Sequence, residues 1–327
     1  MIITRGKRIV FFLLFVAAFS LASCSEKKVE GKAKGRQADV STETFVIALL
    51  PAQNVFKQKQ RYKPLADYLS KSLNMNVKTK LLDSYGAIYN ELVNNEVDAA
   101  FFGSLGYVAM DSRIDIEPVA RALNADGRST YRGLIFALKE RGITDDFRTW
   151  RKKRIALVHK STTAGYIFPK YFLHKKGVKD FAEYFSKVIY TGSHDASILS
   201  VLTGDADIGC ASDLIFDRLA AENPLIAEKL IVLARSAEVP ANIFGVKKGT
   251  DEELKERLRT AFMNMENTPE GKVVLSNLGA SRFIETKESE FGPIFEMLEA
   301  LGLAPETFAL DSIGRGVAWP EGTGTRP

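Results

Sequence analysis

Short runs of consecutive apolar residues alternate along this chain with longer segments in which apolar residues recur every three or four positions. The run at 45–50 ends at Pro51, and a segment at 60–73 with apolar residues at helical spacing follows it. Continuous apolar runs of this length are typical of strands that are buried on both faces, whereas the longer period indicates helices. Their alternation predicts the α/β fold class with mostly parallel sheets.

The same patterns place the remaining elements. Further strands are expected at 77–82, 98–103, 116–123, 131–139, 154–159, 187–191, 206–211, 230–236 and 241–247. Further helices are expected at 86–95, 164–176, 195–203, 213–222, 251–266, 269–278 and 288–301. The helix at 251–266 has the clearest apolar stripe, and its acidic first turn suits the positive end of the helix dipole.

Two turn-rich breaks suggest where the chain divides. They lie at 124–129 and at 238–240. The length of 327 residues corresponds to two units at about 150 residues per domain. We therefore expect lobe one to contain residues 45–127 and 238–327, and lobe two to contain residues 128–237. Two crossings at one hinge would leave a cleft lined by loops at strand ends, where α/β proteins usually bind ligands.

Residues 1–23 have the pattern of an export signal. Arg5, Lys7 and Arg8 precede an apolar run at 9–22 that ends in small residues. This run is shorter than the roughly 20 residues that a membrane-spanning helix needs, which favours a cleaved signal over a membrane anchor.

The signal ends in Leu21-Ala22-Ser23-Cys24, which resembles a bacterial lipobox. In such signals, cleavage precedes the cysteine and a lipid is attached to its thiol. The alternative is a plain secretory signal followed by an incidental cysteine. The lipobox predicts a lipidated Cys24. Residues 25–44 are polar and lack periodicity, so we expect residues 24–44 to form the lipidated cysteine and a flexible tether. The predicted location is periplasmic or extracytoplasmic, with the protein anchored to the membrane at Cys24.

Composition excludes several classes of protein. The net charge is +5, and the three basic residues of the signal account for most of it, which is too little for a nucleic-acid partner. Two cysteines cannot form a disulfide framework, and Cys210 is expected to be a small buried apolar residue. The three histidines have no zinc-site spacing, and no phosphate-loop or dinucleotide glycine pattern is present. We therefore expect no metal and no cofactor.

One hydroxyl-rich segment stands at a predicted strand-to-helix turn. The residues are Lys160-Ser161-Thr162-Thr163-Ala164-Gly165. Free N–H groups at a helix start, the helix dipole and three hydroxyls together form an anion site. The alternative is that Ser161 or Thr162 only caps its own helix.

A second strand-to-helix turn contains His194, within Thr191-Gly192-Ser193-His194-Asp195-Ala196. The histidine could donate a hydrogen bond to an anion, although by itself the motif is better explained by Ser193 or His194 acting only as a helix-start residue. Both turns fall in the predicted lobe two, and successive turns of this kind open into the same crevice.

Three further residues are candidates for the cleft. Ser104 and Tyr107 follow the predicted strand at 98–103 and offer hydroxyls, although Tyr107 could equally be a packed helix residue. Asp213 begins a helix, where it either caps that helix or pairs with a cationic or protonated group of a ligand. A Ser161–His194–Asp213 hydrolase can be drawn from these residues, but the chain lacks a nucleophile elbow, and we expect no enzyme.

These motifs, in this order, resemble the phosphonate-binding family of periplasmic solute-binding proteins. Members of this family are the receptor components of ABC importers for phosphonate, phosphite and related phosphorus oxyanions. The resemblance covers roughly residues 45–285. The matching stretches are 62–69, 97–103, 161–165 with Pro169, and 192–196 with 204–207.

The resemblance implies a two-lobed periplasmic binding protein type II fold that closes on a small phosphorus oxyanion and delivers it to an ABC permease. It implies oxyanion binding by Thr162 and Thr163, with Ser161 beside them. It also assigns the family histidine to His194, the cleft tyrosine to Tyr107 and the acidic residue to Asp213. Ala164 departs from the family pattern, which commonly has serine there. An alternative function for the same fold is an exported sensor that signals ligand occupancy to a membrane kinase.

Overall fold

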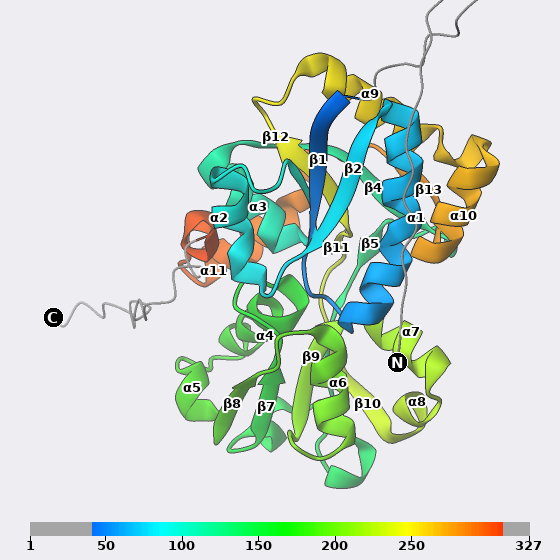
Figure 1. The fold of residues 1–327 in the computed structure, drawn as a ribbon. Coiled ribbons are helices and arrows are strands. Elements are labelled where there is room, and N and C mark those ends of the chain that lie inside the picture. The colour runs from blue at the N-terminus through cyan, green and yellow to red at the C-terminus, as the bar shows by residue number, and fades with distance from the viewer. Residues whose placement is uncertain (1–40, 310–327) are drawn as a thin grey trace, which may run out of the picture. The chain divides into compact units, whose positions relative to one another are not determined.

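The computed structural model describes residues 41–309, which contain two large β-sheets and one small one (Figure 1). The predicted signal, Cys24 and most of the tether lie outside these residues. The six-stranded sheet has the order β13-β4-β12-β3-β1-β2. Its strands are β1 (Ser41–Leu49), β2 (Met75–Leu81), β3 (Ala99–Phe102), β4 (Ile116–Asn124), β12 (Ile243–Lys247) and β13 (Ala280–Ile284).

The five-stranded sheet has the order β10-β6-β9-β7-β8. Its strands are β6 (Gly133–Leu138), β7 (Arg154–Leu157), β8 (Lys187–Tyr190), β9 (Ile208–Ser212) and β10 (Leu230–Arg235). We call the two halves the six-stranded lobe and the five-stranded lobe. The two-lobed α/β fold that the sequence predicts is confirmed.

A small two-stranded sheet joins the lobes. It pairs β5 (Thr130–Tyr131) with β11 (Val239–Pro240) in antiparallel fashion, and Figure 1 shows both strands between the larger sheets. The chain leaves the six-stranded sheet after β4 and returns to it through β11 and β12. The hinge is therefore a double crossover.

Strand direction follows from this hinge. β1, β2 and β3 pair in parallel, as do β7, β8 and β9. β12 and β6 each begin just after a hinge strand, and both run antiparallel to their neighbours. Both sheets are consequently mixed, although most strands in each still share one direction. Their carboxyl ends point towards the hinge, which is the edge where ligands bind in α/β folds.

Helices cover the faces of both sheets. In the six-stranded lobe they are α1 (Val55–Leu73), α2 (Ile88–Val93), α3 (Ser104–Ile114), α9 (Glu252–Met263), α10 (Pro269–Leu278) and α11 (Gly292–Ala300). In the five-stranded lobe they are α4 (Phe168–Lys175), α5 (Phe181–Tyr184), α6 (His194–Leu202), α7 (Asp213–Glu222) and α8 (Leu225–Lys229). Of the described helices, none is long and apolar enough to cross a membrane.

The predicted helix at 251–266 is shorter than expected but buries the expected stripe. The Asp251 carboxylate accepts the N–H of Leu254 at the start of α9, and the helix ends at Met263. On its buried face, the ring of Phe262 lies 4.6 Å from that of Phe244 and 4.7 Å from that of Phe283. Burial of these rings against the sheet is the main stabilisation that this helix contributes.

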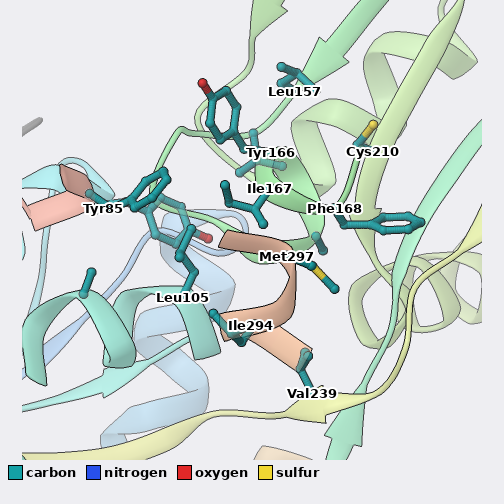
Figure 2. Close-up of a cluster of buried hydrophobic side chains, with 14 of the residues drawn as sticks. Tyr85, Leu105, Leu157, Tyr166, Ile167, Phe168, Cys210, Val239, Ile294 and Met297 are labelled. Carbon is teal, nitrogen blue, oxygen red and sulfur yellow. The ribbon is translucent and has the colours of Figure 1, made fainter. Parts of the chain in front are cut away.

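A single buried cluster extends from one lobe to the other. Figure 2 shows part of it, with labelled side chains that include Tyr85, Leu105, Ile167, Phe168, Cys210, Val239, Ile294 and Met297. α11 contacts both α3 and α4, so it packs against both lobes. Cys210 is fully buried, as predicted, and burial raises the pKa of its thiol.

Candidate functional site

A cavity of about 120 Å³ lies at the carboxyl ends of the parallel strands and is lined by both lobes. The six-stranded lobe contributes the ends of β1 and β3 and one face of α1. The five-stranded lobe contributes the turn after β7 and the starts of α6 and α7. The polar lining residues are Gln53, Gln58, Arg61, Tyr62, Tyr85, Tyr131, Ser161, Thr162, Thr163, His194, Ser212, Arg218 and Asn242.

Four of the predicted site residues meet at this cavity. Ser161, Thr162, Thr163 and His194 all line it, and each is less than a tenth exposed. The two turns that carry them are hydrogen-bonded to each other, because the N–H of Gly192 donates to the carbonyl of Val158 at 3.0 Å. They converge since β7 and β8 are parallel neighbours that end at the same edge.

We call residues 161–165 the anion loop. It leads into a π-helical turn, Thr163–Ile167, that continues directly into α4. Within the described part of the chain, no backbone or side-chain acceptor takes the N–H of Thr163, Ala164 or Gly165. The first N–H groups of a helix have no partner inside that helix, so these three donors remain available to an anion.

The three hydroxyls of the anion loop are not equivalent. Ser161 Oγ donates to the carbonyl of Phe308 at 3.3 Å, and Thr162 Oγ1 donates to that of His159 at 2.6 Å. Thr163 Oγ1 instead accepts the N–H of Leu105, from the other lobe, at 3.1 Å. Of the three, the Thr163 hydroxyl therefore keeps its proton free of any backbone carbonyl.

His194 is held as a neutral donor. Its Nδ1 accepts the N–H of Ser212 at 3.2 Å, which assigns the proton of the neutral ring to Nε2. Burial lowers the pKa of His194 to about 4, with Asp195 opposing the shift. Protonation of Nδ1 would break the bond from Ser212. The positive charge that the sequence allowed for this histidine is thus disfavoured, and what it offers is an N–H.

The prediction that Tyr107 faces the cleft was wrong. Its ring stacks on that of Phe291, with centroids 4.5 Å apart, and its hydroxyl donates to the carbonyl of Ile116 at 3.4 Å. The residue lies one helical turn along α3 from Ser104, on the face that packs against the core. The tyrosines that line the cavity are Tyr62, Tyr85 and Tyr131. Burial raises the pKa of Tyr131, in the hinge strand β5, despite its hydrogen bonds with Thr163 and Ser104.

Ser104 and Asp213 also differ from expectation, because both bind the hinge region and neither lines the cavity. Ser104 Oγ donates to the carbonyl of Pro240 at 2.6 Å. The carboxylate of Asp213 accepts the backbone N–H of Arg132 at 3.0 Å and lies 3.3 Å from a guanidinium nitrogen of Arg128. Burial nevertheless raises the pKa of Asp213.

These contacts also remove the hydrolase alternative. A catalytic triad needs a carboxylate that accepts a proton from the second nitrogen of the histidine. Here Nδ1 of His194 is itself an acceptor, and the Asp213 carboxylate is directed to Arg132 and Arg128. Among residues 41–309, no group of His, Cys, Asp or Glu side chains is arranged to hold a metal ion.

Two arginines that were not predicted from the sequence, Arg61 of α1 and Arg218 of α7, line the same cavity. Arg218 Nη1 donates to Gln53 Oε1 at 3.1 Å. A signal was present in α7, where Arg218 follows Leu214 and Ile215 by one helical turn on the side of the helix that faces the cavity. A cation on such a face indicates either a buried ion pair or an anionic ligand.

The family model for "ABC transporter, phosphonate, periplasmic substrate-binding protein" matches residues 47–291, most of the chain. The chain belongs to this family. The family resemblance proposed from the motifs is therefore confirmed, and family membership indicates a periplasmic location.

Relatives in this family are distant in sequence. The chain is 25% identical over 240 residues to the phosphate-import protein PhnD of Mycolicibacterium smegmatis, covering 71% of this chain and 74% of the relative. It is 24% identical to the phosphonates-binding periplasmic protein of Escherichia coli, covering 89% and 84%.

Solved structures share the fold. A binding-protein component of an ABC phosphonate transporter from Pseudomonas aeruginosa superimposes with a TM-score of 0.73 at 22% identity, covering 79% of this chain and 86% of that one. PhnD1 from Prochlorococcus marinus, in complex with methylphosphonate, gives a TM-score of 0.70 at 21% identity, covering 80% and 99%.

Proposed function

We propose that this protein is the substrate-binding component of an ABC importer and that it holds a small phosphorus oxyanion at the anion loop. The observation that carries the proposal is the set of three N–H groups, those of Thr163, Ala164 and Gly165, that have no acceptor among residues 41–309 and lie beside a cavity lined by both lobes. Family membership supports the same ligand class.

The binding groups are donors, as an oxyanion requires. The three N–H groups lie at the positive end of the helix dipole, and hydrogen bonds to an ionised acceptor are roughly twice as strong as neutral ones. Thr163 Oγ1 and the Nε2–H of His194 extend this set from two different turns. A tetrahedral anion presents several oxygens, so donors that converge from different directions suit it better than a planar carboxylate.

Closure of the two lobes would be coupled to binding through contacts near the loop. Thr163 joins the lobes through Leu105, and the N–H of His194 donates to the carbonyl of Ala52 at 3.3 Å. The carboxylate of Asp195 accepts the N–H of Asn54 at 2.7 Å. Because two of these contacts are made by Thr163 and His194, which would touch the anion, a bound ligand favours the closed form, which a permease can then recognise.

We also propose that the protein is exported and anchored by a lipid at Cys24, with residues 25–44 as the tether. An anchored receptor delivers its ligand at the membrane surface, where the permease lies. Mass spectrometry of the membrane-extracted protein tests this, since lipidation requires a mature chain that begins at Cys24 with an added mass of acyl groups. A soluble chain cleaved elsewhere would contradict it.

The ligand class is tested by isothermal calorimetry on the chain from residue 25 onward. Phosphate, phosphite and methylphosphonate are titrated, and methylsulfonate serves as the control of similar shape and lower charge. We expect saturable binding of at least one phosphorus oxyanion and much weaker binding of the sulfonate. Absence of binding by every phosphorus oxyanion would contradict the proposal.

A further inference from the structure

Two cationic side chains line the cavity apart from the anion loop. Arg61 belongs to the six-stranded lobe and Arg218 to the five-stranded lobe, so the two guanidinium groups approach the cavity from opposite lobes. Within residues 41–309, neither group lies within ion-pair distance of a carboxylate. The carboxylate that influences Arg218, that of Glu222, is already paired with Lys57.

Two other arginines of this protein with limited exposure are paired with carboxylates. Arg121, whose side chain is 5% exposed, pairs with Glu290, and Arg154 pairs with Asp207 at 2.8 Å. Burial and the neighbouring Arg61 lower the pKa of Arg218 to about 10. Unpaired cations with little access to water are costly unless an anion joins them. Arg61 and Arg218 would therefore be stabilised by an anionic group that binds between them.

The size of the cavity limits what that group can belong to. A single water molecule needs at least about 10–15 Å³, so the cavity of about 120 Å³ accommodates at most roughly ten non-hydrogen atoms. One phosphoryl group at the anion loop uses four of them. The remainder suffices for a short carbon linker and one further small anionic group, with the aromatic side chains of Tyr62, Tyr85 and Phe101 among the lining residues.

We infer that Arg61 and Arg218 form a second anion subsite, and that the ligand is a small phosphonate whose substituent ends in another anionic group. That group is a carboxylate or a second phosphoryl group, since a guanidinium binds either one through two parallel hydrogen bonds. The inference rests on the proposed function, because it assumes a phosphorus oxyanion at the anion loop. It also predicts discrimination against aminoalkyl phosphonates, whose ammonium group would face two guanidinium groups.

Calorimetry with four ligands of similar size tests the subsite: phosphonoacetate, methylenediphosphonate, methylphosphonate and 2-aminoethylphosphonate. We expect phosphonoacetate or methylenediphosphonate to bind at least about tenfold more tightly than methylphosphonate, and 2-aminoethylphosphonate to bind most weakly. The better of the two doubly anionic ligands identifies the second group.

Variants then test whether Arg61 and Arg218 cause the tighter binding of the doubly anionic ligand. Arg218→Gln and Arg61→Gln should each remove most of the advantage of the doubly anionic ligand while changing methylphosphonate affinity by less than about threefold. Arg148→Gln is the matched control, because it removes the same charge from an exposed side chain and should leave every affinity unchanged. The ligand series on the unaltered protein remains decisive if either cavity variant fails to fold.

The outcomes separate the two proposals. Tight binding of methylphosphonate with no gain from a second anionic group, or with a preference for the amine, would overturn the subsite and leave the proposed function standing. Failure of all four ligands to bind would overturn the subsite, and failure of phosphate and phosphite to bind as well would overturn the proposed function.

Discussion

The hydroxyl oxygen of Thr163 accepts the backbone N–H of Leu105 across the two lobes, at 3.1 Å. One side chain thus belongs both to the proposed oxyanion site and to the contact between lobes. Thr163 is 2% exposed, so bulk water does not compete with its hydroxyl for either interaction. Binding and closure are expected to respond together when it is changed.

Thr163→Val should weaken binding of the preferred phosphorus oxyanion by about 10- to 100-fold, because it removes a donor to an anion and leaves the Leu105 N–H without an acceptor. Thr163→Ser keeps the hydroxyl and should retain affinity within about threefold. Calorimetry measures both. Equal affinities for the valine and serine variants would show that the hydroxyl is not used.

The lowered pKa of His194 predicts that the folding stability of the protein depends on pH. Its pKa in the folded protein, about 4, lies below the ordinary value of 6.5, so the unfolded chain binds more protons between these values. Folding stability should therefore fall as the pH drops from about 6.5 to about 4, by up to about 3 kcal/mol from this residue. His194→Gln removes this contribution.

Urea unfolding of the wild type and His194→Gln at a series of pH values measures the difference, and the variant should lose less stability over that window. His174→Gln, at an exposed position, is the control and should keep the wild-type slope. If the wild type and His194→Gln had the same slope, His194 would not be buried in its neutral form.

Gly165 allows the anion loop to approach the strand beneath it. A β-carbon at this position would lie 2.4 Å from the side chain of Val158 and 2.8 Å from Thr162 Oγ1. Gly165→Ala should therefore lower the unfolding free energy by about 1–3 kcal/mol and abolish ligand binding through displacement of the loop.

Gly106→Ala provides the matched control for that change, since a β-carbon there would meet nothing within 4 Å. It should be neutral or slightly stabilising, because alanine favours the helix. Thermal unfolding compares the two. A Gly165→Ala protein with unaltered melting temperature and affinity would contradict this account, because it would show that the anion loop accommodates a β-carbon at position 165.

Asp213 is expected to act on the hinge and not on ligand choice. Asp213→Asn weakens the carboxylate contacts to the Arg132 N–H and to Arg128, and should cost about 1–3 kcal/mol of stability. The order of affinities among phosphonates should stay the same. If this variant changed the affinity for aminoalkyl phosphonates selectively, Asp213 would have to contact the ligand after all.

Local patterns predicted which turns would meet, because the rule that parallel strands end at a common edge needs only the order of strands and helices. The turns that contain Ser161 to Thr163 and His194 reach one cavity for this reason. Their role in binding stays a prediction. The antiparallel entry of β12 and β6 could not be anticipated, since strand direction depends on where the hinge returns the chain.

Side-chain orientation was harder to predict than position along the chain. Tyr107 and Asp213 stand at suitable turns, but the packing of Phe291 and the hinge backbone determine where their polar groups point. Arg61 and Arg218 were missed for the opposite reason. A charged residue on a helix is normally expected to face solvent. Arg61 and Arg218 line a cavity only because α1 and α7, which belong to different lobes, meet there.

A crystal structure of the protein grown with methylphosphonate tests the central claim most directly. We predict phosphonate oxygens within about 2.7–3.2 Å of the N–H nitrogens of Thr163, Ala164 and Gly165, with His194 Nε2 donating to the same group. A phosphonate bound elsewhere in the cavity, with these three N–H groups facing only water, would contradict the account.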